Sequence, residues 1–166
     1  MTPSILPDDL TQLATRVIVA NRDAGRTVAM AESCTGGLVA AALTEIAGSS
    51  VVLDRGFVTY SNAAKMECLG VAADIIETFG AVSIACVWAM AQGALVKSSA
   101  DVAVAISGVA GPDGGTDLKP VGTVVFAKIV RGEERDPHGE LRDFGQVGRA
   151  DIRRQATLCA LELLLP

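Results

Sequence analysis

The sequence predicts an α/β fold, a three-layer α/β/α sandwich with a mixed central sheet. Residues 102–106 form a near-continuous apolar run, which is typical of a strand buried on both faces. Residues 122–130 predict the next strand, and the connection between the two favours antiparallel pairing. Segments with helical periodicity separate the other strands, so helices are expected on both faces of the sheet.

The first third of the chain predicts two helices and two strands. Apolar residues at three- and four-residue spacing predict a helix over 7–24, and a short buried strand follows at 27–30. An alanine-rich helix is predicted over 38–47, and 49–60 predict a strand that is interrupted or turned at Gly56. The apolar face of the first helix consists of Leu10, Leu13, Ala14, Val17 and Ile18.

Three further helices are predicted before the central apolar run. Asn62 is expected to cap a short helix over 63–69, and a second short helix is expected over 74–79. Ser83 caps a longer helix that extends to about residue 99. The single tryptophan, Trp88, lies on this helix and is expected to fill the core.

The last third predicts a loop, an edge strand and a closing helix. Residues 107–122 are rich in glycine, and a loop of this length without structure of its own suggests a functional loop. Residues 131–139 are polar and turn-rich, 140–144 predict an edge strand, and 149–165 predict a helix. The apolar stripe of that helix consists of Ile152, Ala156, Cys159, Ala160 and Leu163.

Length and composition indicate a single domain over residues 1–166, with residues 1–6 flexible. Apolar residues make up 50% and charged residues 20%, and a heavily buried sheet or an oligomer interface would absorb the apolar excess. No run approaches the roughly 18 apolar residues of a membrane span. Asp8 and Asp9 lie where a secretory signal would be basic. We therefore expect a cytoplasmic protein that does not bind membranes.

Charge and cysteine usage argue against other classes of protein. The net charge is -5 and aromatic residues make up 4%, which is unlike a nucleic-acid-binding surface. The four cysteines form no CxxC pair, and the chain has one histidine, His138, expected at the surface. We expect buried free thiols in a reducing compartment, no metal and no cofactor. The cysteines are Cys34, Cys68, Cys86 and Cys159.

The chain is organised around residues 31–37, Ala-Glu-Ser-Cys-Thr-Gly-Gly, between a predicted strand and a predicted helix. Main-chain N–H groups at such a helix start can hold an anion or a developing oxyanion. Small hydroxyl residues there are also ordinary helix caps. Glu32 is either an acid of the site or a cap partner, and Cys34 is expected to be a packing thiol rather than a nucleophile.

Ser33, Tyr60 and Lys65 form the sharpest set of candidate catalytic residues. A serine hydroxyl needs a base to remove its proton, and a lysine whose pKa is lowered by burial can serve as that base. A tyrosine could relay the proton or give it to departing ammonia. The alternative is an exposed helix lysine and a tyrosine that merely ends a strand.

The glycine-rich residues 107–115 are interpreted as a nucleotide-contacting loop, in which successive N–H groups face a phosphate. A plain connecting loop is the alternative. Lys119 either pairs with that phosphate or lies in solvent before Pro120. The contacts expected from the loop are Ser107, Gly108, Gly111 and Gly114.

Four motifs together carry a resemblance to a known family. They are AESCTGG at 31–37, GFVTYSN at 56–62, SGVAGPDGG at 107–115 and KPVGT at 119–123. In this order they resemble the CinA C-terminal domain family, over most of the chain. The resemblance implies deamidation of nicotinamide mononucleotide, which releases ammonia and leaves nicotinate mononucleotide, and it suggests a homodimer that acts on this small-molecule substrate.

The same resemblance places Ser33, Tyr60 and Lys65 on the family's catalytic serine, tyrosine and lysine positions. It implies attack by Ser33 on the carboxamide carbon, with Lys65 as general base and Tyr60 as proton relay. Main-chain amides near Thr35, Gly36 and Gly37 would hold the oxyanion.

Other assignments stay open at this stage. Ser50, in the matching segment 47–50, is a second candidate for the nucleophile or a substrate contact. The family's Phe-x-Gly-x-Arg run is altered here, with four residues between Phe144 and Arg149, and a ligand contact is still assigned to Arg149. Two alternative functions are a non-catalytic nucleotide-binding or regulatory module, linked to competence or DNA damage, and deamidation of a related nicotinamide compound.

Overall fold

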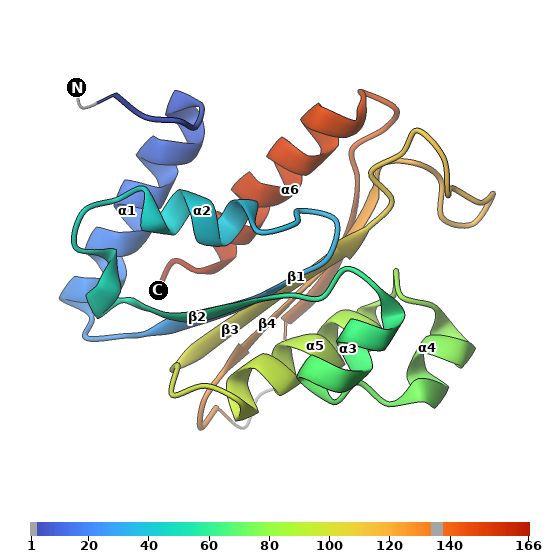
Figure 1. Cartoon of the computed structure of the whole chain (residues 1–166), viewed down its shortest axis with the longest axis horizontal. Coiled ribbons are helices and arrows are strands. Elements are labelled where there is room, and N and C mark those ends of the chain that lie inside the picture. The colour runs from blue at the N-terminus through green and yellow to red at the C-terminus, as the bar shows by residue number, and fades with distance from the viewer. Residues whose placement is uncertain (1–2, 134–137) are drawn as a thin grey trace.

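The computed structural model describes residues 3–133 and 138–166, and it contains one five-stranded mixed sheet (Figure 1). The strand order is β2-β1-β3-β4-β5. Strands β2, β1 and β3 run parallel, and β4 runs antiparallel to both β3 and β5. The mixed sheet and the antiparallel β3–β4 pair are as the sequence predicts. The strands are β1 (Val28–Glu32), β2 (Leu53–Val58), β3 (Val102–Gly108), β4 (Thr123–Val130) and β5 (His138–Asp143).

Helices cover both faces of this sheet, which confirms the three-layer architecture (Figure 1). One layer holds α1 (Asp8–Asp23), α2 (Leu38–Thr44) and α6 (Arg149–Leu163). The other holds α3 (Asn62–Leu69), α4 (Ala73–Phe79) and α5 (Ile84–Val96). A short 3₁₀ turn, Ser49–Val51, precedes β2. None of the helices in the described ranges has the length and hydropathy of a membrane-spanning segment.

Strand β3 divides the core into two parts. Its Val102, Val104 and Ile106 pack in the cluster that contains the residues of α1, α2 and α6. Its Ala103 and Ala105 pack in the cluster that contains the residues of α5. Because side chains alternate between the faces of a strand, the large residues fill one layer and the small ones let α5 approach the sheet closely.

Two expectations about a turn and a helix cap are wrong. Gly56 does not turn the chain but lies within β2, where a Cβ would come 3.1 Å from Met30 Sδ and 3.3 Å from Ala40 Cβ. The glycine thus allows close packing beneath α2. Asn62 does not cap α3, because the Ser61 hydroxyl accepts from the Ala64 N–H instead.

Trp88 is also misplaced by the sequence pattern, since 47% of its surface is exposed. The predicted helix over 38–47 ends at Thr44. Other apolar positions are confirmed, because all five predicted core residues of α1 are buried. Of the predicted polar stretch 131–139, residues 134–137 lie outside the described residues, and His138 begins β5 with its Nε2 2.7 Å from Glu140 Oε2.

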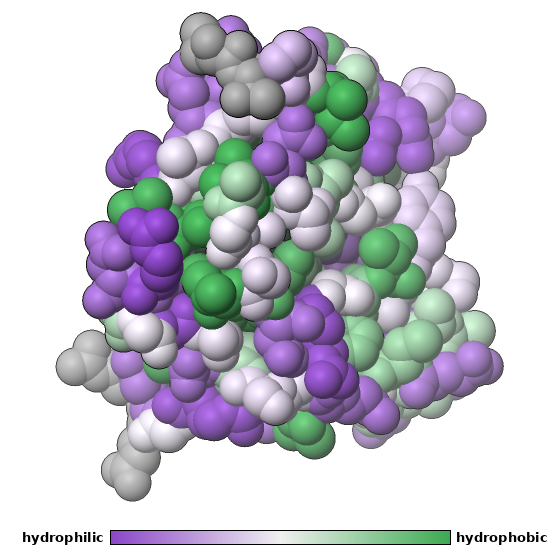
Figure 2. All heavy atoms as spheres, turned by 60° about the vertical axis from the view of Figure 1, so that its left-hand side comes forward, coloured by the Kyte–Doolittle hydropathy of each residue, from purple (hydrophilic) through white to green (hydrophobic). Residues whose placement is uncertain are grey.

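The face turned forward in Figure 2 carries exposed apolar residues among hydrophilic ones. In that view the described residues form no single large apolar patch. Larger contiguous patches mark interfaces more often than scattered apolar residues do.

The packing of α5 against α3 gives a first prediction. A Cβ at Gly93 of α5 would overlap the main-chain carbonyl of Leu69, the last residue of α3. Gly93→Ala is therefore expected to lower the free energy of unfolding by about 2 kcal/mol. At a solvent-exposed helix position the same substitution would be stabilising, because alanine has the higher helix propensity. Urea unfolding would measure the change. Gln92→Ala, on the exposed side of the same helix, is the control and should have little effect; an equally stable Gly93→Ala variant would contradict the packing.

Candidate active site

Three parallel strands end at the same edge of the sheet, and the candidate site lies there. Strand β1 lies between β2 and β3, so the segments that leave all three strands meet. In open α/β sheets, ligands bind in the crevice outside the carboxyl ends of the strands. A cavity of about 300 Å³ occupies this position and includes Ser33, Tyr60, Lys65 and Arg149 in its lining.

Ser33 and Lys65, which are 32 residues apart in sequence, meet in this cavity. The distance from Lys65 Nζ to Ser33 Oγ is 2.9 Å. Strand β1 delivers Ser33 just past its last residue, and α3 carries Lys65 near its start. The contact that the sequence only suggested is therefore present.

Lys65 is buried although it is a cationic residue. Only 1% of its surface is exposed, and none of the ion pairs between described residues includes it. Burial lowers the pKa of Lys65, because removal from water disfavours the ammonium form. The other partners of Nζ are the carbonyl oxygens of Thr59 at 2.9 Å and Tyr60 at 3.2 Å.

The three oxygen atoms around Nζ can serve either protonation state of Lys65, and burial favours the neutral amine. A neutral lysine has two hydrogens and one lone pair, whereas the ammonium form has three hydrogens and no acceptor. The carbonyls of Thr59 and Tyr60 can accept the two hydrogens. The lone pair then faces the Ser33 hydroxyl, which is the arrangement that a general base needs.

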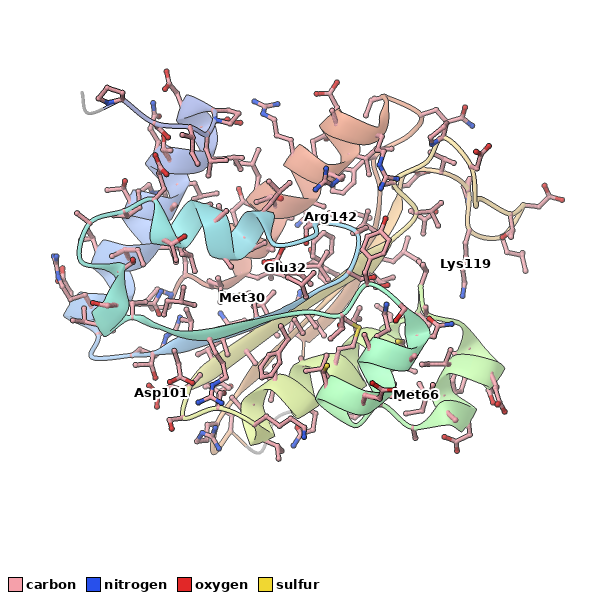
Figure 3. All side chains as sticks on the ribbon, in the orientation of Figure 1. Met30, Glu32, Met66, Asp101, Lys119 and Arg142 are labelled. Atoms are coloured by element: carbon pink, nitrogen blue, oxygen red, sulfur yellow. The ribbon has the colours of Figure 1, made fainter. Side chains whose placement is uncertain are left out.

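Glu32 occupies the start of α2 and changes the expected role of the amides there (Figure 3). Its carboxylate is 1% exposed and accepts from the N–H groups of Gly37, Val39 and Ala40 and from the Thr35 hydroxyl. The chain thus supplies its own anion to this helix N-terminus. The Gly37 amide is not free to hold an oxyanion, and Glu32 is a cap partner.

The Gly36 amide is also committed, because it donates to the Ser33 carbonyl at 3.0 Å. Thr35, Gly36 and Gly37 do not line the cavity. Their expected contact with substrate is therefore not supported by the geometry. The residue of this turn that lines the cavity beside Ser33 is Cys34.

Arg149 joins three segments at the cavity. Its Nη1 donates to the Gly111 carbonyl at 2.6 Å, and its Nη2 donates to the Tyr60 hydroxyl at 2.9 Å. Tyr60 contacts Lys65 through its main-chain carbonyl, while its hydroxyl is directed to Arg149. Despite the altered spacing before α6, Arg149 reaches the site.

The end of β3 and the loop that follows it line the cavity. Ser107, Gly108, Gly111 and Gly114 all contribute, and Ser107 is buried. Lys119 does not point into the cavity. Its Nζ donates to the carbonyl of Phe79 at 2.7 Å, so it ties the loop to the end of α4 (Figure 3).

Ser50 is placed far from the other candidates. It is exposed on the 3₁₀ turn before β2, whereas Ser33 follows the end of β1. Because β1 and β2 run parallel, these two positions lie at opposite ends of the sheet (Figure 1). Within one chain, Ser50 does not belong to this cavity.

The sequence analysis missed two polar residues of the cavity, Asn62 and Asp113. Asn62 was assigned to a cap, but it lies three residues before Lys65 and therefore shares its helix face. That spacing was the available signal. Asp113 lies within the loop motif, and nothing in its local pattern set it apart. Among the described residues, no three of His, Cys, Asp and Glu are grouped so that they could hold a metal ion.

Three of the four cysteines are buried and one is not. Burial raises the pKa of the Cys34 thiol to about 11, which fits a packing role beside Ser33. Cys86 and Cys159 are buried as well. The expectation of a buried thiol is wrong for Cys68, which is exposed on α3.

The capping contacts of Glu32 give a second prediction. Glu32→Gln keeps the shape but replaces one acceptor oxygen with an NH₂ group that faces N–H donors. We expect the free energy of unfolding to fall by about 2 kcal/mol, because hydrogen bonds to charged groups are strong. Thermal and urea unfolding would measure this, with Glu77→Gln on the exposed side of α4 as the control. Equal stability of the Glu32 and Glu77 variants would contradict the capping role.

Comparison with known proteins identifies relatives over most of the chain. The chain is 50% identical over 157 residues to the nicotinamide-nucleotide amidohydrolase PncC of Escherichia coli K12, covering 94% of this chain and 93% of that protein. It is 52% identical to a CinA-like protein of Mycobacterium sp. (strain JLS), covering 85% of this chain and 33% of that protein.

Solved structures show the same fold. The competence/damage inducible protein CihA of Agrobacterium tumefaciens is 49% identical with a TM-score of 0.93, covering 98% of this chain and 97% of that one. A CinA superfamily protein of Klebsiella pneumoniae is 41% identical with a TM-score of 0.87, covering 93% and 94%. The CinA C-terminal domain model matches residues 10–166. This chain therefore belongs to the CinA C-terminal domain family.

Proposed function

We propose that this chain hydrolyses the carboxamide of nicotinamide mononucleotide to nicotinate mononucleotide and ammonia. Relatives at 50% and 57% identity are named nicotinamide-nucleotide amidohydrolase PncC. The observation that carries the proposal is the 2.9 Å contact between the buried Lys65 Nζ and Ser33 Oγ. This pair supplies a nucleophile and its base, which amide hydrolysis through an acyl-enzyme requires.

In the first step, Ser33 Oγ forms a bond to the carboxamide carbon and its proton passes to Lys65 Nζ. The C–N bond of the tetrahedral intermediate then breaks, and the proton that Lys65 accepted passes, relayed by the Tyr60 hydroxyl, to the leaving nitrogen, which departs as ammonia. Water opens the resulting ester, and the same lysine accepts a proton from that water. Lys65 returns to its neutral form in each half-reaction, because its proton goes to the leaving nitrogen in the first and to Ser33 Oγ in the second.

The oxyanion needs a donor other than the amides of Gly36 and Gly37, which are already bonded. Cys34 lines the cavity, and no other described residue accepts a hydrogen bond from its main-chain N–H. This N–H group is on the residue that directly follows Ser33, the proposed nucleophile. We assign the oxyanion to this N–H group.

The substrate phosphate is assigned to Arg149 and the loop after β3. Arg149 is exposed at the cavity and bonds the loop at Gly111. An arginine is always charged and presents several donors to a phosphate. Tyr60, whose hydroxyl accepts from Arg149, keeps its own O–H available, so it can give this proton to the leaving nitrogen as it takes up the one held by Lys65. We also propose that the protein is a cytoplasmic homodimer. The net charge of -5 supports the absence of a nucleic-acid partner.

Substitution of the nucleophile gives the central test. Ser33→Ala is expected to lower kcat for ammonia release from nicotinamide mononucleotide by about 10⁴-fold or more. Ser50→Ala should retain full activity, since Ser50 lies at the other end of the sheet. The assay uses chelator-treated protein, with nicotinamide, its riboside and NAD as comparison substrates. Loss of activity in Ser50→Ala but not in Ser33→Ala would reverse the assignment. A wild-type protein that binds the nucleotide but hydrolyses no amide would favour a binding module.

The lowered pKa of Lys65 fixes the direction of the pH dependence. The base must be unprotonated, so kcat/KM should rise with pH to a plateau, with a midpoint below the ordinary lysine value of 10.5. Lys65→Arg should lose the activity at every pH, because a guanidinium does not give up its proton. Lys97→Arg, at an exposed position after α5, is the control. A kcat/KM of the wild type that falls as the pH rises toward 10.5 would contradict Lys65 as the base.

A further inference from the structure

Arg153 reaches from α6 to the turn that carries Ser33. Its Nε donates to the Cys34 carbonyl at 3.0 Å, and its Nη2 donates to the Thr35 carbonyl at 3.1 Å. The side chain is half-buried, and none of the ion pairs between described residues includes it. The guanidinium thus donates to two successive main-chain carbonyls and forms no ion pair with a carboxylate of the described residues.

Gly36 makes room for this contact. Its φ is +61°, and a Cβ there would lie 3.3 Å from Nη2 of Arg153. A side chain at this position would be strained and would press on the guanidinium. The glycine in the Ser-Cys-Thr-Gly-Gly run therefore allows the close approach of Arg153.

Two bonds from one planar group fix two successive peptide groups at once. A single flexible donor could hold one carbonyl but not the relative orientation of both. In a trans peptide the Thr35 N–H points opposite to the Cys34 carbonyl, so Arg153 sets the direction of that amide as well. Glu32 binds the N–H groups that follow, and Arg153 binds the carbonyls.

We propose that Arg153 is a positioning residue for the reaction, which holds Ser33 Oγ and the Cys34 N–H in their reactive places. It does not line the cavity and acts only through the turn. Its charge also polarises the bonded peptide groups, because hydrogen bonds in a chain strengthen one another. This inference rests on the proposed function, since it assigns the turn a role in acyl transfer.

The test compares Arg153→Lys with Arg154→Lys. Arg154 is the neighbouring residue on α6, and it pairs with Asp9 at the surface. Arg153→Lys keeps the charge but loses the planar fork, and we expect kcat for nicotinamide mononucleotide to fall by about 100-fold, as for a displaced reacting group. KM should change by less than about threefold, and Arg154→Lys should match the wild type in both constants.

Chemical rescue separates positioning from a merely structural role. In Arg153→Ala, added guanidinium or methylguanidinium ions should raise kcat in a saturable manner without raising the melting temperature in parallel. The ions should not change kcat of Arg154→Ala. A kcat of Arg153→Lys equal to that of the wild type, a change confined to KM, or a loss of activity that follows the loss of folded protein would overturn the proposal.

A second readout does not depend on the substrate. A fluorophosphonate probe forms a Ser33 Oγ–P bond and releases fluoride, while the serine proton passes to Lys65. Its reaction rate should be lower in Arg153→Lys by on the order of tenfold or more, with the pH midpoint set by Lys65 unchanged. Equal labelling rates in both proteins would overturn the role of Arg153. A wild-type protein that is labelled at Ser33 but releases no ammonia would contradict the proposed function alone. If Arg153→Ala does not fold, the kinetics and labelling of Arg153→Lys decide whether Arg153 is a positioning residue.

Discussion

The contact between Lys65 and Ser33 requires a lysine to be buried without a carboxylate partner, and several features of the structure serve that requirement. Transfer of an ammonium group out of water costs several kcal/mol, so the neutral form is favoured. The helix that carries Lys65 has 8 residues, too few to be stable alone. The Ser61 hydroxyl caps its start, Gly70 with φ +70° ends it, and the Leu69 carbonyl packs directly against Gly93 of α5, where there is no room for a Cβ. The base is thus delivered by a short helix that its neighbours hold in place.

The turn at Ser33 is fixed in a complementary way. A helix start with glycines is ordinarily open to an anion from solution, but Glu32 fills this one with a carboxylate from the preceding strand. Two opposite charges then bind the main chain around the nucleophile, Glu32 through N–H groups and Arg153 through carbonyls. A turn held by both kinds of main-chain group has little freedom to move Ser33 away from Lys65.

The sequence was sufficient for the fold wherever local pattern decided the structure. The apolar run of β3 and the periodic face of α1 are local signals, and both are confirmed. Gly56 was misread because its reason is a tertiary contact with Met30 and Ala40, which no local pattern contains. Trp88 was misread because α5 is apolar on nearly all sides, so its sequence does not distinguish the face toward solvent.

The site residues could be predicted from the sequence where strand order alone decides their position. Ser33 and Tyr60 come just after β1 and β2, and Ser107 is the next-to-last residue of β3, so the order of these parallel strands alone brings the three residues to one edge. Ser50 matched a motif but precedes its strand, and motif membership does not say at which end of a sheet a residue lies. The capping role of Glu32 was only one of two alternatives, since a carboxylate beside a helix start can face inward or toward a ligand.

The division of charge between Lys65 and Arg149 argues for catalysis over simple binding. A protein that only bound a nucleotide would gain most from a lysine that stays protonated and faces the phosphate. Here Lys65 faces a serine hydroxyl and two carbonyls, and burial lowers its pKa. The permanent cation at the cavity is Arg149, which is exposed and bonded to the loop. Lysine can lose its proton and arginine cannot, so each residue stands where its chemistry is of use: the base against the nucleophile, and the fixed charge where an anionic substrate would enter.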